Sequence, residues 1–263
     1  DGDTIEFRNV SFAYDVRTPV LKDLNFSIPV GRTTAIVGIS GHGKSTILNL
    51  IMRMMDVSSG AILIGGVDIR RMAQRELRSQ MALVNQFFTG FPGSIYFNIA
   101  YGAICQNKLV SRADVISAAR SVGLCDKIMA LPHGFDSPFD AQGGAMSGGE
   151  LQRMGLARAL VKQAPILLLD EATAALDSIS ETKIMEHIRR SGKTRTTVIL
   201  AHRLSTIRDA DQIIVLDHGR VAETGTHLEL VARGGIYSKM WNMAQQAQAS
   251  DSSVIAAPVG DIA

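Results

Sequence analysis

The chain has few cysteines, few aromatic residues and no marked excess of charge of either sign. Its 263 residues include 2 cysteines and 1 tryptophan, and its formal net charge is +2. Two cysteines without a C-x-x-C pair exclude a disulfide scaffold and predict free, buried thiols in a reducing, cytosolic setting. The near-neutral charge gives no electrostatic reason to expect nucleic acid or an anionic membrane as a partner.

Long hydrophobic segments are also missing. No apolar run approaches the roughly 18 residues that span a bilayer, and no signal peptide is visible. The first residue is Asp1 rather than Met, from which we expect an excised piece of a longer polypeptide. The length allows one large domain or two small lobes, with a substantial core.

One glycine-rich stretch dominates what is present. Residues 38–46 read G-I-S-G-H-G-K-S-T and fit the phosphate-binding pattern G-x-x-x-x-G-K-[ST]. A buried strand is predicted at 33–37 and a helix at 46–51, which is the context the motif needs. Glycines let the backbone approach an anion, and N–H groups at the helix start face the phosphates. The predicted nucleotide ligands are Gly38, Ser40, Gly41, His42, Gly43, Lys44, Ser45 and Thr46.

Within that loop, two side chains have specific roles. Lys44 is predicted to reach the β- and γ-phosphates, and the Ser45 hydroxyl to hold Mg²⁺. Gln86 follows a short buried strand at 81–84. Because strand carboxyl ends line the ligand crevice of an open α/β sheet, Gln86 is a predicted ligand for Mg²⁺ or for the attacking water.

Two further strands end in polar residues. The apolar run at 166–169 ends in Asp170 and Glu171, and the run at 196–201 ends in His202. Two carboxylates at the end of a buried strand are costly unless they serve a cation or take up a proton. Asp170 therefore suits Mg²⁺ through water, Glu171 suits general-base or water-orienting work, and His202 suits a γ-phosphate contact.

Several features leave two interpretations open. Tyr14 could stack on a nucleotide base or pack at the sheet edge. Residues 147–149, Ser-Gly-Gly, could form a second anion site or a flexible helix cap. The aromatic loop 87–93 could be a docking surface or a local core. Capping boxes are predicted at 111–114 and 178–181.

Taken together, the motifs resemble those of the nucleotide-binding domain of an ATP-binding cassette (ABC) transporter, over residues from about 5 to 245. Residues 202–227 are similar to exporter-type members, in which this domain follows a membrane domain on one polypeptide. The matched motifs, in family order, are Walker A (38–46), the Q-loop (Gln86), the signature (146–150), Walker B (166–170) with the catalytic Glu171, the D-loop (175–177) and the switch His202; Tyr14 falls at the adenine-stacking position.

The resemblance implies an α/β fold: a P-loop NTPase (RecA-like) core with an antiparallel β edge and an inserted α-helical subdomain. The expected division is a domain at 1–245, with the core at 1–86 and 154–245 and the helical subdomain at 87–153. Residues 246–263 lose periodicity and are predicted to be a disordered tail.

It further implies an ATPase with Mg²⁺ on the cytoplasmic side of a membrane transporter, or in the cytosol if isolated. Two such domains would sandwich two ATP molecules, with Ser147, Gly148, Gly149 and Asp177 completing the partner's site. A transmembrane domain is the other expected partner, and no nucleic acid is expected. An importer subunit and a soluble non-transport cassette remain alternatives. Glu150 and Ala141 depart from the common family sequence, and their effect is left open.

Overall fold

The computed structural model describes residues 4–15, 18–39, 41–106, 108–139, 146–190, 195–200 and 203–254. Its centre is a six-stranded sheet in the order β12-β11-β3-β10-β9-β6. Five strands run parallel and β12 is antiparallel to β11. The strands are β3 (Thr33–Gly38), β6 (Met81–Val84), β9 (Ile166–Asp170), β10 (Thr196–Leu200), β11 (Gln212–Asp217) and β12 (Arg220–Gly225).

The register of this sheet decides where the site forms. Leu216 of β11 pairs with Gly38 of β3, and Leu200 of β10 pairs with Asp170 of β9. Every residue of β10 is buried, as expected for a central parallel strand covered on both faces. The carboxyl ends of the parallel strands therefore open onto one edge, where the sequence predicted the ligands.

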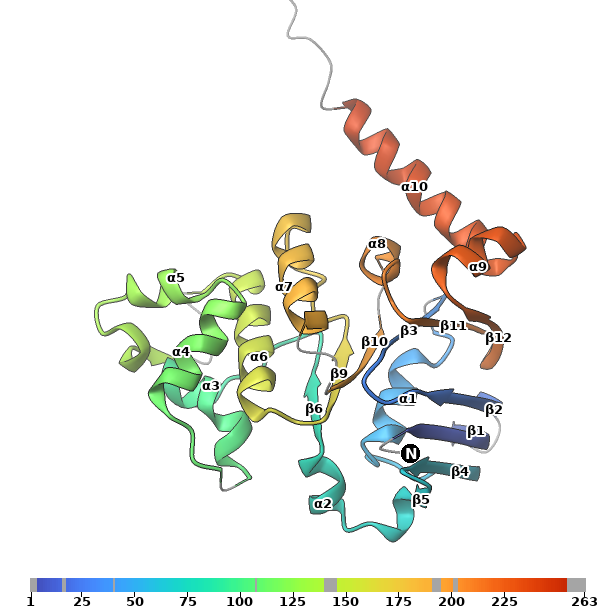
Figure 1. Cartoon of the computed structure of the whole chain (residues 1–263), viewed down its shortest axis with the longest axis horizontal. Coiled ribbons are helices and arrows are strands. Elements are labelled where there is room, and N and C mark those ends of the chain that lie inside the picture. The colour runs from blue at the N-terminus through green and yellow to red at the C-terminus, as the bar shows by residue number, and fades with distance from the viewer. Residues whose placement is uncertain are drawn as a thin grey trace, which may run out of the picture.

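A second sheet is antiparallel, in the order β2-β1-β4-β5. Helix α1 (Lys44–Ile51) lies between the two sheets (Figure 1) and buries Ile47, Leu48 and Leu50 in a core shared with both. A turn at Gly65 and Gly66 joins β4 to β5. The strands of this sheet are β1 (Ile5–Asp15), β2 (Thr18–Ile28), β4 (Ser59–Ile64) and β5 (Val67–Asp68).

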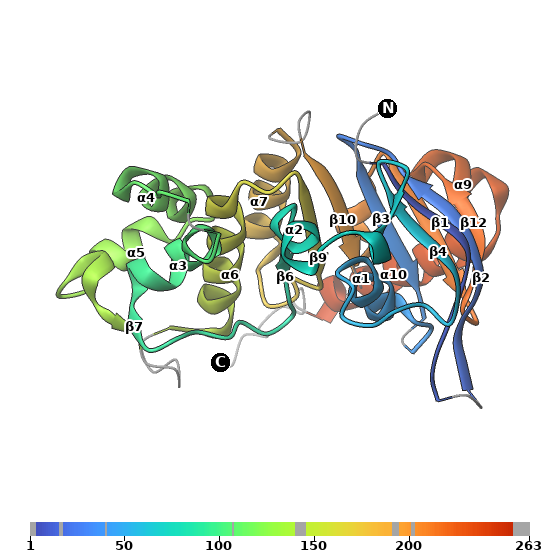
Figure 2. The same cartoon turned by 90° about the horizontal axis from the view of Figure 1, so that it is seen from below.

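A helical lobe occupies the other side of the central sheet in both views (Figures 1 and 2). Its longest helix, α6, packs on the lobe helices and on β6 and β9 in one continuous core. α6 is continuous across position 153, where the sequence interpretation placed the subdomain boundary. The lobe consists of α3 (Ile95–Ile104), α4 (Arg112–Ser121), α5 (Cys125–Met129), α6 (Gly148–Lys162), the 3-10 turn η2 (Gly134–Asp136), and the short strands β7 (Gly93–Ser94) and β8 (Pro138–Phe139).

The remaining helices flank the central sheet: η1 (Ile69–Arg71), α2 (Gln74–Ser79), α7 (Ser178–Arg190), α8 (Leu204–Ile207), α9 (His227–Arg233) and α10 (Ile236–Val254). Helix α10 extends away from the body (Figure 1) and continues well past Gln245. Residues 246–254 of the tail predicted as disordered are thus helical, because Ala and Gln after Met243 are good helix formers even without an apolar stripe. Residues 255–263 of that prediction lie outside the described residues. Among the described residues, no helix is both long and apolar enough to cross a membrane.

Two local predictions need correction. The capping box at 178–181 is wrong: Asp177 precedes α7, and its Oδ1 accepts a hydrogen bond from the Ser180 amide at 2.9 Å. Glu181 turns inward instead, toward Thr173 and Thr206. The second correction concerns the cysteines, which were predicted to be free and buried. Both are free, but only Cys125 is buried, whereas Cys105 is exposed at the end of α3. The capping box of α4 at Ser111 is confirmed.

Candidate functional site

The phosphate-binding loop leaves β3 and enters α1 at the opening edge of the central sheet. Gly43 precedes the helix with φ 91°, and a Cβ there would lie 2.5 Å from Cδ2 of Leu21. A Cβ on Gly38 would lie 2.4 Å from the Leu216 carbonyl oxygen of β11. Both positions therefore require glycine, because the loop is packed directly against neighbouring strands. Ser40 lies outside the described residues.

Lys44 is held inside the loop rather than in solvent. Its residue is 7% exposed, and Nζ donates hydrogen bonds to the carbonyl oxygens of Gly38 at 2.8 Å and Ile39 at 3.2 Å. Burial lowers the pKa of this ammonium, while the nearby charges of Glu171 and Asp170 act to raise it. A buried cation whose hydrogen bonds, among the described residues, go to backbone carbonyls is well placed to receive an anion, as the phosphate prediction requires.

Ser45 and Asp170 come together from opposite sides of the crevice. The Ser45 hydroxyl, on the first turn of α1, donates to Asp170 Oδ1 at 3.3 Å, at the end of β9. A hydroxyl and a carboxylate are hard oxygen ligands, the type that Mg²⁺ prefers. The pair thus fits the magnesium role predicted for both residues.

Glu171 turns out of the sheet directly after Asp170. Its backbone has φ 51°, a conformation that non-glycine residues seldom adopt, and its amide donates to the Leu200 carbonyl of β10 at 3.0 Å. Such strained positions concentrate at functional sites, where the surrounding structure holds them. The geometry brings Glu171 into the electrostatic range of Lys44. His202, predicted beside it, lies outside the described residues.

A buried glutamine that the sequence analysis missed connects the loops around this site. Gln152 of α6 is 6% exposed; its Nε2 donates to the Gln86 carbonyl at 3.1 Å, and its Oε1 accepts from the Ala175 amide at 2.8 Å. Gln86 itself is exposed beyond β6. Helical spacing did give a signal, because Gln152 shares a face with the apolar Leu156 and Ala159.

Tyr14 lies at the rim of the phosphate-binding loop. Its hydroxyl is 3.1 Å from Oγ1 of Thr46, and its ring meets Phe12 edge-on at 4.9 Å between centroids. The residue is 62% exposed. One ring edge therefore packs on the sheet while much of the ring faces solvent next to the loop, which is the placement that base stacking needs.

The Ser-Gly-Gly segment begins α6, and Ser147 and Glu150 form a capping box there. The Ser147 hydroxyl accepts from the Glu150 amide at 3.3 Å, and Glu150 Oε2 accepts from the Ser147 amide at 2.7 Å. The hydrogen bond from the Ser147 amide lowers the pKa of Glu150, whose carboxylate also pairs with Lys127 at 3.6 Å. The negative charge of Glu150 is therefore stabilised locally, by the Ser147 amide at the helix cap and by Lys127. Gly148 has open space around its Cα, whereas a Cβ on Gly149 would lie 2.9 Å from the Ala175 carbonyl.

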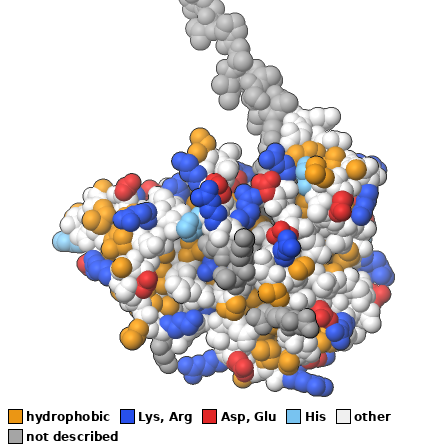
Figure 3. Space-filling view, viewed as in Figure 1, with side chains coloured by type: hydrophobic (Ala, Val, Ile, Leu, Met, Phe, Trp, Pro, Cys, Tyr) orange, Lys and Arg blue, Asp and Glu red, His pale blue; other side chains and the backbone are white. Residues whose placement is uncertain are grey.

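Asp177 and Glu181 form the polar base of α7. Besides capping the helix, Asp177 lies 3.7 Å from Arg153 of α6. Glu181 is 5% exposed and pairs with Arg203 at 3.2 Å, beside the segment that carries His202. Lys and Arg side chains gather over α7 on the face shown in Figure 3. The carboxylate of Glu181 is a second buried group that the sequence analysis missed; it ties the D-loop segment to α8.

The aromatic loop combines the two interpretations left open for it. Phe88 and Phe91 pack on Arg158 of α6, whose guanidinium carbon lies 4.3 Å and 5.3 Å from their ring centroids. Burial lowers the pKa of Arg158 to about 10. Phe87, in contrast, is 77% exposed beside a cavity of about 140 Å³ that Gln152 also lines. The loop is a local core with one exposed aromatic residue.

Comparisons with known proteins agree with this geometry. A family model described as ABC transporter matches residues 21–174, more than half of the chain. The chain is 48% identical to an ATP-dependent lipid A-core flippase of Syntrophus aciditrophicus over 91% of its length and 39% of the relative's. It is 45% identical to an ATM1-type heavy metal exporter of Novosphingobium aromaticivorans, over 95% of the chain and 41% of the relative.

A solved structure, a bacterial Atm1-family ABC exporter with ATP bound, superposes with a TM-score of 0.88 at 45% identity. The match covers 94% of this chain and 42% of that one. The chain belongs to the ABC transporter family and corresponds to the nucleotide-binding domain of its members. It spans about two fifths of the length of the relatives that it matches. The α/β P-loop fold expected from the sequence is confirmed.

Proposed function

We propose that the chain is the ATP-hydrolysing motor of an ABC exporter, acting on the cytoplasmic side of a membrane. The observation that carries this proposal is the convergence of three residues on one sheet edge: the buried Lys44, and Ser45 hydrogen bonded to Asp170. The similarity to exporters rather than importers supports the direction of transport.

In this proposal the residues divide the chemistry. Lys44 would exchange its carbonyl contacts for the β- and γ-phosphate oxygens. Ser45 and Asp170 would hold Mg²⁺, with Gln86, just after β6, as a further ligand. The metal, when bound, neutralises charge on the phosphates. Glu171, directly after Asp170, takes a proton from the attacking water or orients it, and His202 contacts the γ-phosphate. Tyr14 stacks on the base.

The proposed assembly is a head-to-tail dimer with a second copy or a similar domain. Figures 1 and 2 place α6 in the helical lobe and α1 between the sheets, so the Ser147 end of α6 and the phosphate-binding loop belong to different parts of one chain. We propose that Ser147, Gly148 and Gly149 complete the site of the partner, with Asp177 beside them. The open space at Gly148 suits the approach of a phosphate to the backbone.

The transmembrane partner is proposed to contact the molecule at Phe87. That ring is exposed, lines the same cavity as Phe88 and Arg158, and adjoins Gln86 in sequence. Gln152 ties the Gln86 backbone to the D-loop segment through Ala175. Movement at the docking surface would therefore reach the nucleotide site over a single buried side chain. The transported substrate would be bound by the membrane domain.

The test of the hydrolytic proposal is Glu171→Gln, which keeps the shape of the side chain and removes its basicity. Phosphate release should fall about 100-fold or more, while ATP affinity is kept, because the lost group acts on water and not on the nucleotide. Glu186→Gln serves as the matched control, since Glu186 pairs only with Arg190 on the exposed face of α7 among the described contacts. Near-normal phosphate release in Glu171→Gln would show that this carboxylate is not catalytic.

A further inference from the structure

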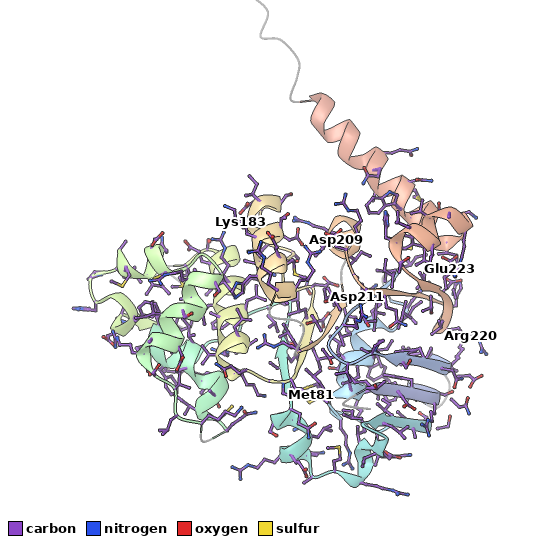
Figure 4. The ribbon with its side chains drawn as sticks, in the orientation of Figure 1. Met81, Lys183, Asp209, Asp211, Arg220 and Glu223 are labelled. Carbon is purple, nitrogen blue, oxygen red and sulfur yellow. The ribbon has the colours of Figure 1, made fainter. Side chains whose placement is uncertain are left out.

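The side chains of two histidines and one aspartate cluster where the phosphate-binding loop meets the β11–β12 turn, and these side chains have no role in the mechanism above. His42 is the loop residue between Gly41 and Gly43, while Asp217 and His218 come from the end of β11 and the turn to β12. One ligand atom of each residue lies within 4.8 Å of those of the other two. Figure 4 labels Asp211, just before β11, and Arg220, just after this turn.

The distances suit a small cation. Asp217 Oδ1 lies 3.6 Å from His42 Nδ1 and 3.7 Å from His218 Nε2. A tetrahedral zinc ion, about 2.1 Å from each ligand, sets its ligands about 3.4 Å apart. Two of the three separations thus need to close by only a few tenths of an ångström. The third can close by rotation of His218, whose side chain is 81% exposed.

The backbone around the cluster is fixed before any ion binds. His218 and Gly219 have φ 46° and 78°, the left-handed pair of a tight two-residue hairpin. The Gly219 carbonyl accepts from the Lys22 amide of β2 at 2.8 Å, and a Cβ on Gly219 would lie 2.2 Å from the Val20 carbonyl. The turn is therefore pressed against β2. On the other side, the Gly38 position packs against β11.

The ring of His42 directs its unprotonated nitrogen, Nδ1, toward the β11–β12 turn. Its Nδ1 accepts a hydrogen bond from the His218 amide at 3.2 Å, which places the proton of a neutral imidazole on Nε2. The side chain of His42 is only 16% exposed, and its ring lies 4.8 Å from that of His218. A metal ion at Nδ1 would take the lone pair that the amide proton now uses.

From this geometry we propose that His42, Asp217 and His218 form a binding site for a divalent transition metal of the zinc class. Two imidazoles and one carboxylate are typical ligands of zinc, whereas Mg²⁺ takes oxygen ligands and belongs to the Ser45–Asp170 pair. Three protein ligands leave a fourth position for water. The bound ion would tie the phosphate-binding loop to the β11–β12 turn, and so restrain the loop from the side opposite the nucleotide.

The experiment titrates the untagged, nucleotide-free 263-residue chain with zinc chloride by calorimetry in a non-chelating buffer. We expect one zinc ion per chain, and binding at least about tenfold weaker in His42→Ala, Asp217→Asn and His218→Asn. Asn at 218 tolerates the left-handed backbone, and Asn at 217 keeps the shape of Asp. Cobalt absorption in the same titration reports a tetrahedral nitrogen and oxygen site, and magnesium chloride should give no such binding.

Two control variants remove competing ligands elsewhere. Cys105→Ser removes the exposed thiol and His133→Ala an exposed histidine, and both should bind zinc as the parent chain does. Thermal melts without metal check that the variants are folded. Unchanged zinc affinity in folded His218→Asn and Asp217→Asn, or loss of binding in Cys105→Ser, would overturn the assignment. The absence of any zinc binding by the parent chain would overturn it as well.

Discussion

The two segments of this chain that we propose to bind phosphate, residues 38–46 and 147–149, are built in opposite ways. The phosphate-binding loop is enclosed: strands pack on both of its sides, Gly38 touches β11, and Lys44 is almost fully buried. The start of α6 stands at the surface of the helical lobe, where its capping box satisfies the first amides and Gly148 meets open space. The phosphate-binding loop is thus constrained by neighbouring strands, whereas the start of α6 is exposed.

The difference teaches which parts of the site are complete in one chain. A buried lysine, a serine and a carboxylate already converge at the first segment, so all the side chains that we propose for phosphate and metal there come from one chain. The second segment has its local hydrogen bonds satisfied, yet offers an exposed helix start without a ligand from its own chain among the described residues. Surface access at Gly148 is useful only if another molecule brings the phosphate.

Paired glycine substitutions should show the largest effect. Gly38→Ala places a methyl group 2.4 Å from the Leu216 carbonyl, so we expect the free energy of unfolding to fall by about 3 kcal/mol. Gly148→Ala adds the same methyl in open space at a helix start and should leave stability within about 0.5 kcal/mol of the parent. Urea unfolding of both variants makes the measurement. Equal midpoints would mean that the two segments are equally constrained.

Base stacking by Tyr14 is the next largest effect and concerns only the enclosed segment. Tyr14→Ala should weaken ATP binding by roughly 1–3 kcal/mol, whereas Tyr14→Trp should keep it, because any aromatic face stacks on a base. Tyr14→Phe separates stacking from the hydroxyl contact with Thr46 and should bind almost as well as the parent. Fluorescent-nucleotide titration provides the affinities. If Tyr14→Ala binds as tightly as the parent, the ring only packs at the sheet edge.

Gln152 connects the backbone of Gln86 to that of Ala175, and its loss should reduce turnover without weakening ATP binding. Gln152→Leu keeps the volume but loses the bonds to Gln86 and Ala175, so turnover should fall about tenfold, the equivalent of one buried hydrogen bond. ATP affinity should stay close to the parent value, since no contact of Lys44 or Tyr14 is touched. Parallel measurements of affinity and phosphate release decide this; a matching loss in both would show general damage to the site.

Local sequence patterns predicted the phosphate-binding loop well, because the strand, the loop and the helix that form it are contiguous in the sequence. The run from Thr33 to Ile51 carries strand, loop and helix in one stretch, and Asp170 and Glu171 end a strand whose apolar run is visible. The contact between Ser45 and Asp170 then follows from the parallel sheet order. No local pattern reveals such a contact by itself; the shared strand-end positions do.

Long-range contacts account for what the sequence did not show. Glu181 looked like the end of a capping box, but it is drawn inward by Thr173, Thr206 and Arg203, groups that approach from other segments. Gln152 was hidden because a buried polar side chain is identified by its partners, which lie 66 and 23 residues away. Helix α10 continued because helix propensity does not need an apolar stripe.

The central claim is that one functional site is shared between two chains, and mixing two inactive variants tests it most directly. Lys44→Ala removes the buried cation of the enclosed segment, and Ser147→Arg places bulk and charge at the start of α6. Each variant alone should be inactive. In a mixed head-to-tail dimer both lesions fall in one site, so the other site is intact.

Phosphate release should therefore reappear on mixing, up to roughly a quarter of the wild-type sites when the chains pair at random. Activity of the parent chain should also rise faster than linearly with protein concentration, because weakly associating domains must meet. Native mass spectrometry, which resolves mixed dimers from the two homodimers, confirms that mixed dimers form. Recovery of activity near that level is the result predicted here; no recovery in a sample with proven mixed dimers would contradict the shared site.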